Sequence, residues 1–298
     1  MEKGKPSIKF CIIVPVYNEA KHLSRMLDSL LSQSVKPFQI ILVDDGSTDG
    51  SDQIIARYCK ENSFISSIHT QDFSGHLPGE KIVRAFYLGK TLANSSYDVL
   101  CKFDADLFFP ENYLETLQEA FVSDPKLGMA SGLVFVNKQE NWVFENIADK
   151  NHVRGPVKAY RKACFDDIGG IRETIGWDTV DVLLSHYYNW KVKTFESLPV
   201  RQYKFTGQNY TVSRAKKAGI GFYKMRYGFV LSLLSSLKLA YNQKSIVYFF
   251  QCISAFVRAF FSGESYAVNA KEGVFIRKYR YKHLQKNLVQ KFKTNTGI

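Results

Sequence analysis

The first half of the chain alternates short apolar runs with longer amphipathic stretches. Nearly continuous apolar runs occupy residues 10–16, 38–44 and 97–103. Runs of this kind are typical of parallel strands whose two faces are both buried. Because they alternate with helix-like segments, we predict a mostly parallel sheet with helices on its faces, an α/β fold.

Helices are predicted between and after these strands. Residues 19–33 have leucine and methionine at helical spacing. A second helix is expected over residues 51–60, with its N-cap among residues 47–49. A further helix over 111–121 precedes an apolar strand at 127–136, so the α/β pattern continues past the first three strands.

Polar clusters follow three of the predicted strands: PVYNE at 15–19, DDGSTDG at 44–50 and DAD at 104–106. In a parallel α/β sheet, ligands bind at the carboxyl ends of the strands. Each cluster taken alone is also a good turn, helix cap or solvated loop. The combination of the three, rather than any one, predicts a binding site at this edge of the sheet.

The third cluster has the chemistry of a cation site. Asp104 and Asp106 are two residues apart, so on extended backbone their side chains point the same way and can share one divalent cation. Oxygen ligands favour Mg²⁺ or Mn²⁺, which keep positions open for substrate phosphates. Such an ion would offset the charge that develops on a diphosphate leaving group.

In this order and spacing, VPVYNE, VDDGSTDG and a strand-terminal DxD resemble the family 2 glycosyltransferases of the GT-A fold, over roughly residues 10–207. The resemblance implies a Rossmann-like, mostly parallel sheet with flanking helices. It also implies an inverting, metal-assisted hexosyltransferase that uses a nucleotide-diphosphate sugar, with UDP as the default nucleotide. The acceptor would be a saccharide or a lipid-linked sugar in polysaccharide or glycolipid synthesis.

The resemblance also assigns residues to the donor site. The implied donor-binding residues are Pro15, Tyr17, Glu19, Asp44, Asp45, Lys81, Arg84 and Asp104. Within this set, the resemblance implies that Asp44 or Asp45 contacts the nucleotide base. It also implies that Asp104 and Asp106 face the ribose, the diphosphate and the cation, Mn²⁺ or Mg²⁺. For Lys81, an ordinary solvated helix face is an equally good interpretation.

Residues 159–181 resemble the acceptor side of these glycosyltransferases. In this segment an Arg-containing strand end and a Gly-Gly turn precede an acidic motif at a helix start. Asp178 is the candidate general base, and Asp181 is its neighbour or an acceptor contact. An Asp near a helix N-terminus stays ionised more easily, as a base must. The alternative is that Asp178 is only an N-cap.

Two departures from the family pattern stand out. Many relatives have adjacent Glu-Asp in the acidic motif, where this chain has Trp-Asp-Thr. Relatives also often have a His after the next strand that completes the metal site, whereas residues 199–207 contain none. Gln202 or Lys204 stands in that place, and none of the six histidines has ligand-like spacing.

Charge separates the last third of the chain from the rest. The formal net charge is +12, but residues 1–200 contain 22 Lys and Arg against 26 Asp and Glu. Residues 201–298 contain 18 against 2, a net charge of +16. A basic excess of this kind indicates a polyanionic partner, either an anionic membrane or a nucleic acid.

The same region is partly apolar, yet its longest charge-free stretch, residues 245–257, is shorter than the roughly 20 residues that span a bilayer. We therefore predict amphipathic helices lying on an anionic membrane surface. Packing of these helices on the catalytic domain, with a solvated basic face, is the alternative. No nucleic-acid-binding module accompanies the basic segment, so nucleic acid is not expected as a partner.

These features predict a GT-A catalytic domain over residues 1–207, with a donor half at about 1–110 and an acceptor half at 111–207. A basic, mainly helical region follows at 208–298. The start of the chain lacks the apolar stretch of a secretory signal, and the five cysteines form no CxxC pair. We therefore expect a cytoplasmic protein, peripheral on the inner face of the cell membrane.

Two other functions were weighed. A nucleotidyltransferase would need a Gly-rich, basic loop after the first strand, and PVYNEAKH contains no glycine. A non-catalytic nucleotide-sugar-binding or membrane scaffold of the same fold is the remaining alternative. The presence of Asp104, Asp106 and Asp178 argues against the scaffold.

Overall fold

The computed structural model describes residues 7–70, 80–147, 149–204 and 211–296. Contacts group the chain into two compact units. The first unit comprises Met1–Ile171 and Tyr188–Thr206, and the second comprises Arg172–Tyr187 and Gly207–Ile298. The assignment of a catalytic domain to residues 1–207 stays a prediction.

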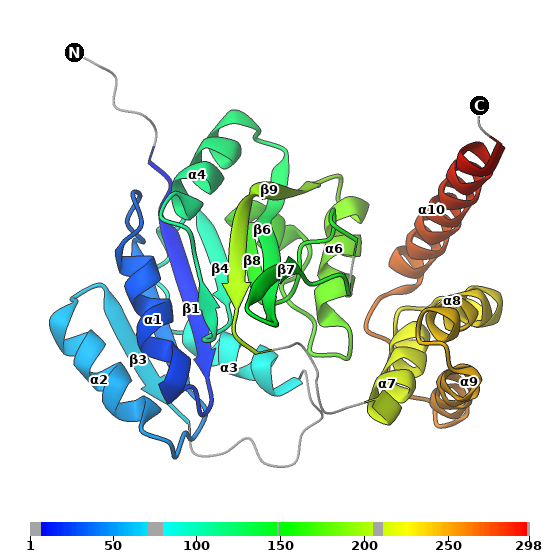
Figure 1. Ribbon diagram of the computed structural model, residues 1–298, viewed down its shortest axis with the longest axis horizontal. Coiled ribbons are helices and arrows are strands. Elements are labelled where there is room, and N and C mark those ends of the chain that lie inside the picture. The colour runs from blue at the N-terminus through cyan, green and yellow to red at the C-terminus, as the bar shows by residue number, and fades with distance from the viewer. Residues whose placement is uncertain (1–6, 71–79, 148, 205–210, 297–298) are drawn as a thin grey trace. The chain divides into compact units, whose positions relative to one another are not determined.

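The first unit is an α/β layer structure around one mixed sheet (Figure 1). Its strands are β1 (Phe10–Val16), β2 (Gln39–Asp44), β3 (Ile65–His69), β4 (Val99–Phe103), β5 (Leu107–Phe108), β6 (Leu127–Lys138), β7 (Asn141–Phe144), β8 (Val157–Arg161) and β9 (Lys191–Gln202). Its helices are α1 (Ala20–Leu31), α2 (Ser51–Glu61), α3 (Glu80–Lys90), α4 (Tyr113–Ser123) and α5 (Lys162–Asp167).

The strand order is β3-β2-β1-β4-β8-β6-β9-β5, with β7 paired to β6. The strands β3, β2, β1 and β4 run parallel, whereas β8 is antiparallel to both of its neighbours. The prediction of an α/β sheet with flanking helices is confirmed. The parallel order holds for the amino-terminal half, and the remaining strands add antiparallel pairs.

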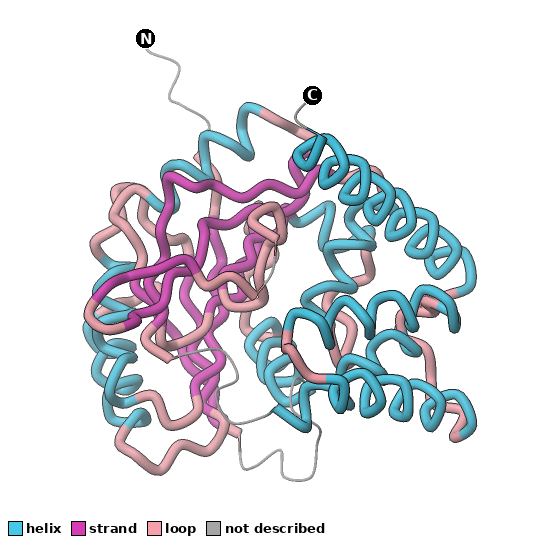
Figure 2. The backbone as a smooth tube through the Cα atoms, turned by 45° about the vertical axis from the view of Figure 1, so that its right-hand side comes forward, coloured by secondary structure: helices cyan, strands magenta, loops and turns pink. Residues whose placement is uncertain are grey.

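Helices lie on both faces of the sheet, with α1, α2 and α4 on one face and α3 on the other. Figure 2 draws the strands in magenta and the helices in cyan. Alternate residues of β1, beginning with Phe10 and Ile12, share one buried cluster with α1, α2 and α4. The intervening residue Ile13 faces α3. There Gly89 lies so close that an added Cβ would come within 2.7 Å of the side chains of Ile13 and Val43. Both faces of the parallel strands are therefore buried, as their continuous apolar sequence requires.

The chain order places a crevice between β1 and β4. From β1 the chain passes to β2 and β3 on one side, and then returns to β4 on the other side of β1. Ligands of open α/β sheets bind at such a switch point, outside the carboxyl ends of the strands. Residues that follow β1 and β4 therefore meet in the position of a binding site.

Several elements are absent from the sequence prediction. The strand β3 has the sequence ISSIH, in which two serines interrupt the apolar pattern, and it lies at the edge of the sheet.

The prediction of a side-chain N-cap for α2 among residues 47–49 is wrong. The N-cap is Gly50, in a left-handed conformation with φ +90°, and no side-chain hydrogen bond caps this helix.

In the second unit, all the regular secondary structure of the described residues is helical. It contains α6 (Trp177–Tyr187), α7 (Thr211–Lys224), α8 (Gly228–Asn242), α9 (Ile246–Phe261) and α10 (Ala270–Thr296). The predicted helical character of the C-terminal region is confirmed. Across the described parts of the chain, no helix combines the length and apolarity needed to cross a bilayer.

Candidate active site

The loops after β1 and β2 are joined by side chains. Asn18, with φ +53°, donates its N–H to Ser47 Oγ at 3.0 Å, and its Oδ1 accepts from Thr48 N at 2.8 Å. Asn is one of the few residues that adopt this left-handed conformation readily. The two loops are therefore held in a single conformation at the edge of the sheet.

A second set of bonds joins the same loops. Asp49 Oδ2 accepts from Ala20 N at 2.9 Å, and Asp49 Oδ1 accepts from Ser51 Oγ at 2.6 Å. Ser51 Oγ in turn accepts from Glu19 N at 2.9 Å. These hydrogen bonds lower the pKa of Asp49, although burial opposes them. The motif residues Ser47, Thr48 and Asp49 thus connect neighbouring loops, and Asp49 Oδ1 also accepts from Ser51 N, at the start of α2, at 3.1 Å.

The two adjacent aspartates at the end of β2 have different environments. Asp44 is buried, accepts from Ser47 N at 3.0 Å, and lies 3.1 Å from His69 Nδ1. Asp45 is half-buried and accepts from Thr70 Oγ1 at 3.3 Å. Asp44 therefore holds the loop after β2 through a buried hydrogen bond, whereas Asp45 lies closer to solvent.

Asp104 and Asp106 lie in the turn between β4 and β5, so the premise that they stand on extended backbone is wrong. Asp104 is ion-paired with Lys102, which is buried within β4. Asp106 is only 5% exposed and accepts from Gln202 Nε2 at 3.4 Å and from Lys204 N at 3.3 Å. The end of β9 therefore holds the carboxylate of Asp106.

Glu19 brings a third carboxylate to the same place. Its Oε1 lies 2.7 Å from Lys204 Nζ. Burial, followed by the negative charges of Asp104 and Glu19, raises the pKa of Asp106 to about 7, against the lowering effect of its hydrogen bonds from Gln202 and Lys204. Burial likewise raises the pKa of Glu19, against the lowering effect of Lys204. The carboxylates at the ends of β1 and β4 are thus close enough to repel one another.

The donor atoms around Asp106 fit a hard divalent cation. Glu19 Oε2 and Gln202 Oε1 are buried, and neither has a hydrogen-bond partner among the described residues. Carboxylate and amide oxygens are ligands that Mg²⁺ and Mn²⁺ accept. In the described segments, no three His, Cys, Asp or Glu side chains are arranged to hold an ion together, so remaining ligands would have to come from elsewhere.

An aromatic and basic rim surrounds Tyr203, the residue between Gln202 and Lys204. The ring of Tyr203 stacks on His22 with centroids 5.0 Å apart, and its hydroxyl accepts from Arg25 Nη1 at 2.8 Å. Trp142 meets the same ring edge-on at 5.5 Å. Burial, followed by the charge of Lys204, lowers the pKa of His22. This rim presents fixed positive charge near the carboxylates.

The other predicted donor residues have varied positions. Pro15 lies within β1, in register with Val43 of β2, and Tyr17 follows the strand with a ring that is 60% exposed. Lys81 and Arg84 lie in the first half of α3 and are half-buried. Their contacts with a donor stay predictions.

Asp178 and Asp181 belong to the second unit. Helix α6 begins at Trp177, so Asp178 lies in its first turn and is not the N-cap. Asp178 is half-buried, whereas Asp181 is buried and accepts from Val182 N at 2.6 Å. Their roles as base and acceptor contact stay predictions.

Two residues of the site escaped the sequence analysis. Lys102 lies in the middle of an apolar run, and a lysine buried there needs a charged partner, which was a usable signal. His69 ends a strand that the apolar pattern did not reveal. Its pairing with Asp44 depends on the parallel register of β2 and β3, which sets the two residues side by side.

Comparison with known proteins gives a family match. The family model described as glycosyl transferase family 2 matches residues 11–168. Glycosyltransferase GlyG of Streptococcus pneumoniae is 31% identical over 108 residues, which cover 36% of this chain and 33% of GlyG. The poly-beta-1,6-N-acetyl-D-glucosamine synthase of Staphylococcus aureus is 28% identical over 120 residues, covering 40% and 27%. The matches span about a third or less of these relatives' own lengths.

Solved structures resemble the chain more extensively. The mannosyltransferase PcManGT from Pyrobaculum calidifontis, in complex with GDP-Man and Mn²⁺, has a TM-score of 0.59 at 15% identity, covering 94% of this chain and 81% of that one. TarS of S. aureus in complex with UDP-GlcNAc has a TM-score of 0.55 at 18% identity, covering 86% and 73%. At these identities the likeness is one of fold, and it confirms the predicted GT-A type.

Proposed function

This chain belongs to glycosyl transferase family 2, and from that membership we propose that it transfers a sugar from a nucleotide-diphosphate sugar to an acceptor hydroxyl with inversion. The observation that carries the proposal is the cluster at the switch point, where Glu19, Asp104 and Asp106 meet Lys204. A UDP-sugar is the first donor to test, since TarS is solved with UDP-GlcNAc. PcManGT, solved with GDP-Man, makes a GDP-sugar the second.

The two loops that Asn18 joins would form the nucleotide end of the site. Asp45, which is nearer to solvent than Asp44, is the better placed of the two to accept a hydrogen bond from the base. The exposed ring of Tyr17 offers a face on which the base can stack. The bonds between the loops hold these groups in place before the donor arrives.

A divalent cation, Mn²⁺ or Mg²⁺, would be held by Asp104 and Asp106, with Gln202 Oε1 as a further oxygen ligand and the remaining ligands supplied by the donor phosphates or water. Such an ion neutralises charge on the donor diphosphate. Two of the structures that resemble this chain in fold are solved with Mn²⁺: PcManGT with GDP-Man, and GalNAc-T7 with UDP and GalNAc. The buried oxygens of this chain that lack a hydrogen-bond partner support a requirement for a divalent cation here as well.

The chain's own residues would carry the transfer as follows. The carboxylate of Asp178 takes the proton of the acceptor hydroxyl, whose oxygen forms a bond to the anomeric carbon from the side opposite the diphosphate. The bond between that carbon and the diphosphate oxygen breaks, and its electron pair leaves with the nucleotide. Lys204 and the rim around Tyr203 bring positive charge toward the diphosphate. A single displacement inverts the anomeric configuration.

The acceptor is proposed to be a saccharide or a lipid-linked sugar in polysaccharide or glycolipid synthesis. The similarity to a poly-N-acetylglucosamine synthase supports a polysaccharide product. The basic C-terminal region supports a place at the inner face of a cell membrane, where lipid-linked acceptors occur.

The test is turnover of a panel of nucleotide-sugars with Mn²⁺ or Mg²⁺, followed by the anomeric configuration of the product. Asp106→Ala and Asp178→Asn should each lower kcat/KM by about 100-fold or more, since each removes a group used in the transition state. Asp52→Asn, on the exposed face of α2, is the matched control. If no nucleotide-sugar binds with either metal, the transferase proposal is wrong. Binding without turnover would favour the scaffold.

A further inference from the structure

Helix α8 exposes several bulky apolar side chains and buries small polar ones. Val230, Leu234, Leu237 and Tyr241 recur at helical spacing along one face, and all four are exposed, Tyr241 to 82%. The buried residues of the same helix are one leucine, Leu231, and three small residues: Ser232, Ser236 and Ala240. A helix that packs on a protein core normally shows the reverse arrangement.

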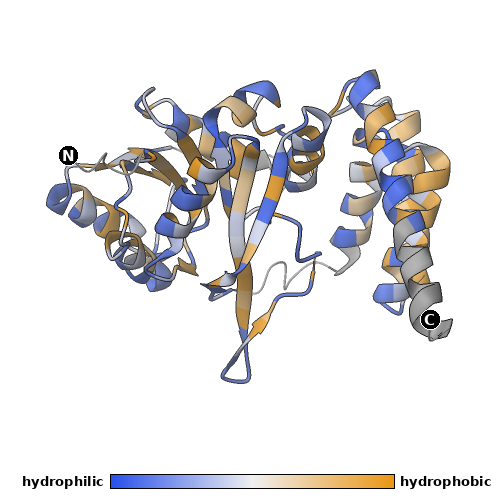
Figure 3. Cartoon of the chain, turned by 90° about the horizontal axis from the view of Figure 1, so that it is seen from above, coloured by the Kyte–Doolittle hydropathy of each residue, from blue (hydrophilic) through white to orange (hydrophobic). Residues whose placement is uncertain are grey.

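Helix α9 repeats this inverted arrangement. Its exposed side includes Val247, Phe250 and Phe261, the last 82% exposed, while its buried residues are Cys252, Ala255, Phe256 and Ala259. Ser236 Oγ of α8 donates to Cys252 Sγ at 3.1 Å, so small polar groups meet between the two helices. In Figure 3 the C-terminal helices accordingly carry long orange stretches.

Small residues let these helices pack closely. An added Cβ on Gly219 of α7 would lie only 2.0 Å from the carbonyl oxygen of Cys252 in α9. Close backbone contact through Gly, Ala and Ser is the way helices associate where the surroundings are themselves apolar. The three helices therefore pack as helices of a membrane-type bundle do, and two of them, α8 and α9, have an apolar exterior.

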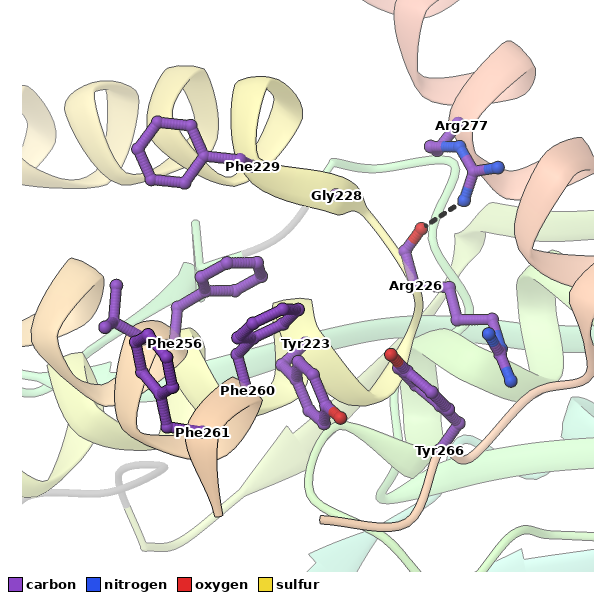
Figure 4. A pocket seen from close by; sticks show the side chains of 10 residues that line it. Tyr223, Arg226, Gly228, Phe229, Phe256, Phe260, Phe261, Tyr266 and Arg277 are labelled. Atoms are coloured by element: carbon purple, nitrogen blue, oxygen red, sulfur yellow. Dashed lines mark hydrogen bonds between the residues drawn. The ribbon is translucent and has the colours of Figure 1, made fainter. Parts of the chain in front are cut away.

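An apolar pocket opens at the same face. It has a volume of about 410 Å³, and aromatic rings from α7, α8 and α9 line it, among them Tyr223, Phe229 and Phe261 (Figure 4). At the other end of the pocket, Arg277 Nη1 donates to the carbonyl oxygen of Arg226 at 2.7 Å. Because Phe229 and Phe261 belong both to the pocket and to the exposed face, the two are continuous.

Charge indicates what covers this face. Residues 228–263 contain no Asp or Glu, and their three charged side chains, Lys238, Lys244 and Arg258, are all exposed. A second copy of the chain would bring like charges together, which disfavours a dimer through this face. An anionic lipid surface complements the lysines and arginine, and its hydrocarbon complements the apolar residues.

We infer that the α8–α9 face inserts into one leaflet of an anionic membrane, with a lipid chain filling the aromatic pocket. The inference deepens the membrane part of the proposed function and rests on it. Helices of 15 and 16 residues are each about 24 Å long at a rise of about 1.5 Å per residue, less than the roughly 30 Å hydrocarbon core. The hairpin therefore lies in the interface, and its cations stay among the headgroups.

The experiment is co-sedimentation of the full chain with vesicles of phosphatidylcholine, with and without phosphatidylglycerol, at low and high salt. Wild type should bind the anionic vesicles and keep a salt-resistant fraction. Leu234→Gln/Leu237→Gln/Phe250→Gln should lower the partition coefficient on the order of 100-fold, since each side chain loses part of its transfer into hydrocarbon. Lys238→Gln/Lys244→Gln should lower only the salt-sensitive part, by roughly 30-fold for two charges near an anionic surface.

The matched control is Leu92→Gln/Val122→Gln, two exposed apolar residues of the first unit, which should leave vesicle binding unchanged. Equal binding by wild type and the triple variant would overturn the inference. So would a concentration-dependent dimer in sedimentation velocity that the triple variant abolishes, in the absence of vesicle binding. Nucleotide-sugar turnover in vesicle-free buffer is measured on the same variants, so failure of this inference is distinguishable from failure of the transferase proposal.

Discussion

The two units of the chain differ in the polar groups that they bury and the apolar groups that they expose. Beside its apolar core, the first buries charge: Lys102, Asp44 and Asp106 lie beneath the surface at the carboxyl ends of the parallel strands, each with a hydrogen-bonding or charged partner. Helices α8 and α9 of the second bury serine, alanine and cysteine beside Leu231 and Phe256, and expose several leucine and phenylalanine side chains. Buried charged groups are typical of a site that binds a charged ligand, whereas an exposed apolar surface is typical of an interface.

The largest effect on stability is expected at the buried ion pair. Lys102→Met should lower the free energy of unfolding by about 3 kcal/mol, because it leaves the carboxylate of Asp104 without its buried partner. Chemical denaturation at neutral pH measures this. The double variant Lys102→Met/Asp104→Asn removes both charges and should recover most of the loss. If the double variant is as unstable as the single one, packing of the lysine stem and not its charge is what matters.

The next effect follows from the pKa of Asp106. Because this pKa is raised to about 7, the folded protein binds a proton that the unfolded chain has released, so stability falls as pH rises toward 7. Between pH 5 and pH 8 wild type should lose about 2 kcal/mol through this group, at 1.36 kcal/mol for each unit of pKa. Asp106→Asn should lack this loss.

Binding of a cation gives a second test of the role of Asp106. At pH 8, Mn²⁺ should raise the thermal stability of wild type and leave Asp106→Asn nearly unchanged, since a ligand that binds only the folded state stabilises it. Denaturation curves with and without the ion measure the difference without any sugar donor. Equal stabilisation of both proteins would place the cation elsewhere.

A smaller effect is expected in the helical unit, where two glycines of α7 form a matched pair. Gly219→Ala should destabilise by about 1–2 kcal/mol, because the added Cβ meets the Cys252 carbonyl and forces the helices apart. Gly221→Ala should instead stabilise by about 0.5 kcal/mol through helix propensity, since its nearest neighbour is 3.8 Å away. Thermal denaturation of the two variants should therefore move in opposite directions.

The smallest effect tests the exposed apolar face directly. Leu237→Gln in α8 should change stability by less than about 0.5 kcal/mol, because the side chain is already in solvent. The same substitution at Leu27, which α1 buries completely, should cost several kcal/mol. A large cost at both positions would mean that Leu237 packs inside the folded protein, and the contrast between the units would fail.

Local pattern was sufficient for much of the first unit. The strands β1, β2, β4 and β6 and the helices α1, α2 and α4 follow from apolar spacing, because their burial is continuous over several residues. The strands β3, β5 and β7 are short, polar or at an edge, so they carry too few apolar positions for a period to show. Motif order alone also indicated the family and the edge of the sheet where the donor site lies.

Only the tertiary structure decided how the motif residues are used. Asp104 and Asp106 stand on a turn and not a strand, and Gln202, almost one hundred residues later, reaches Asp106 because β9 and β5 are paired. Asn18 and Asp49 join two loops that the sequence separates by 30 residues. Sequence by itself determined the longer strands and helices and the set of charged groups, since these depend on local spacing and residue type. Their partners, burial and pKa depend on distances between remote segments, which only the folded chain fixes.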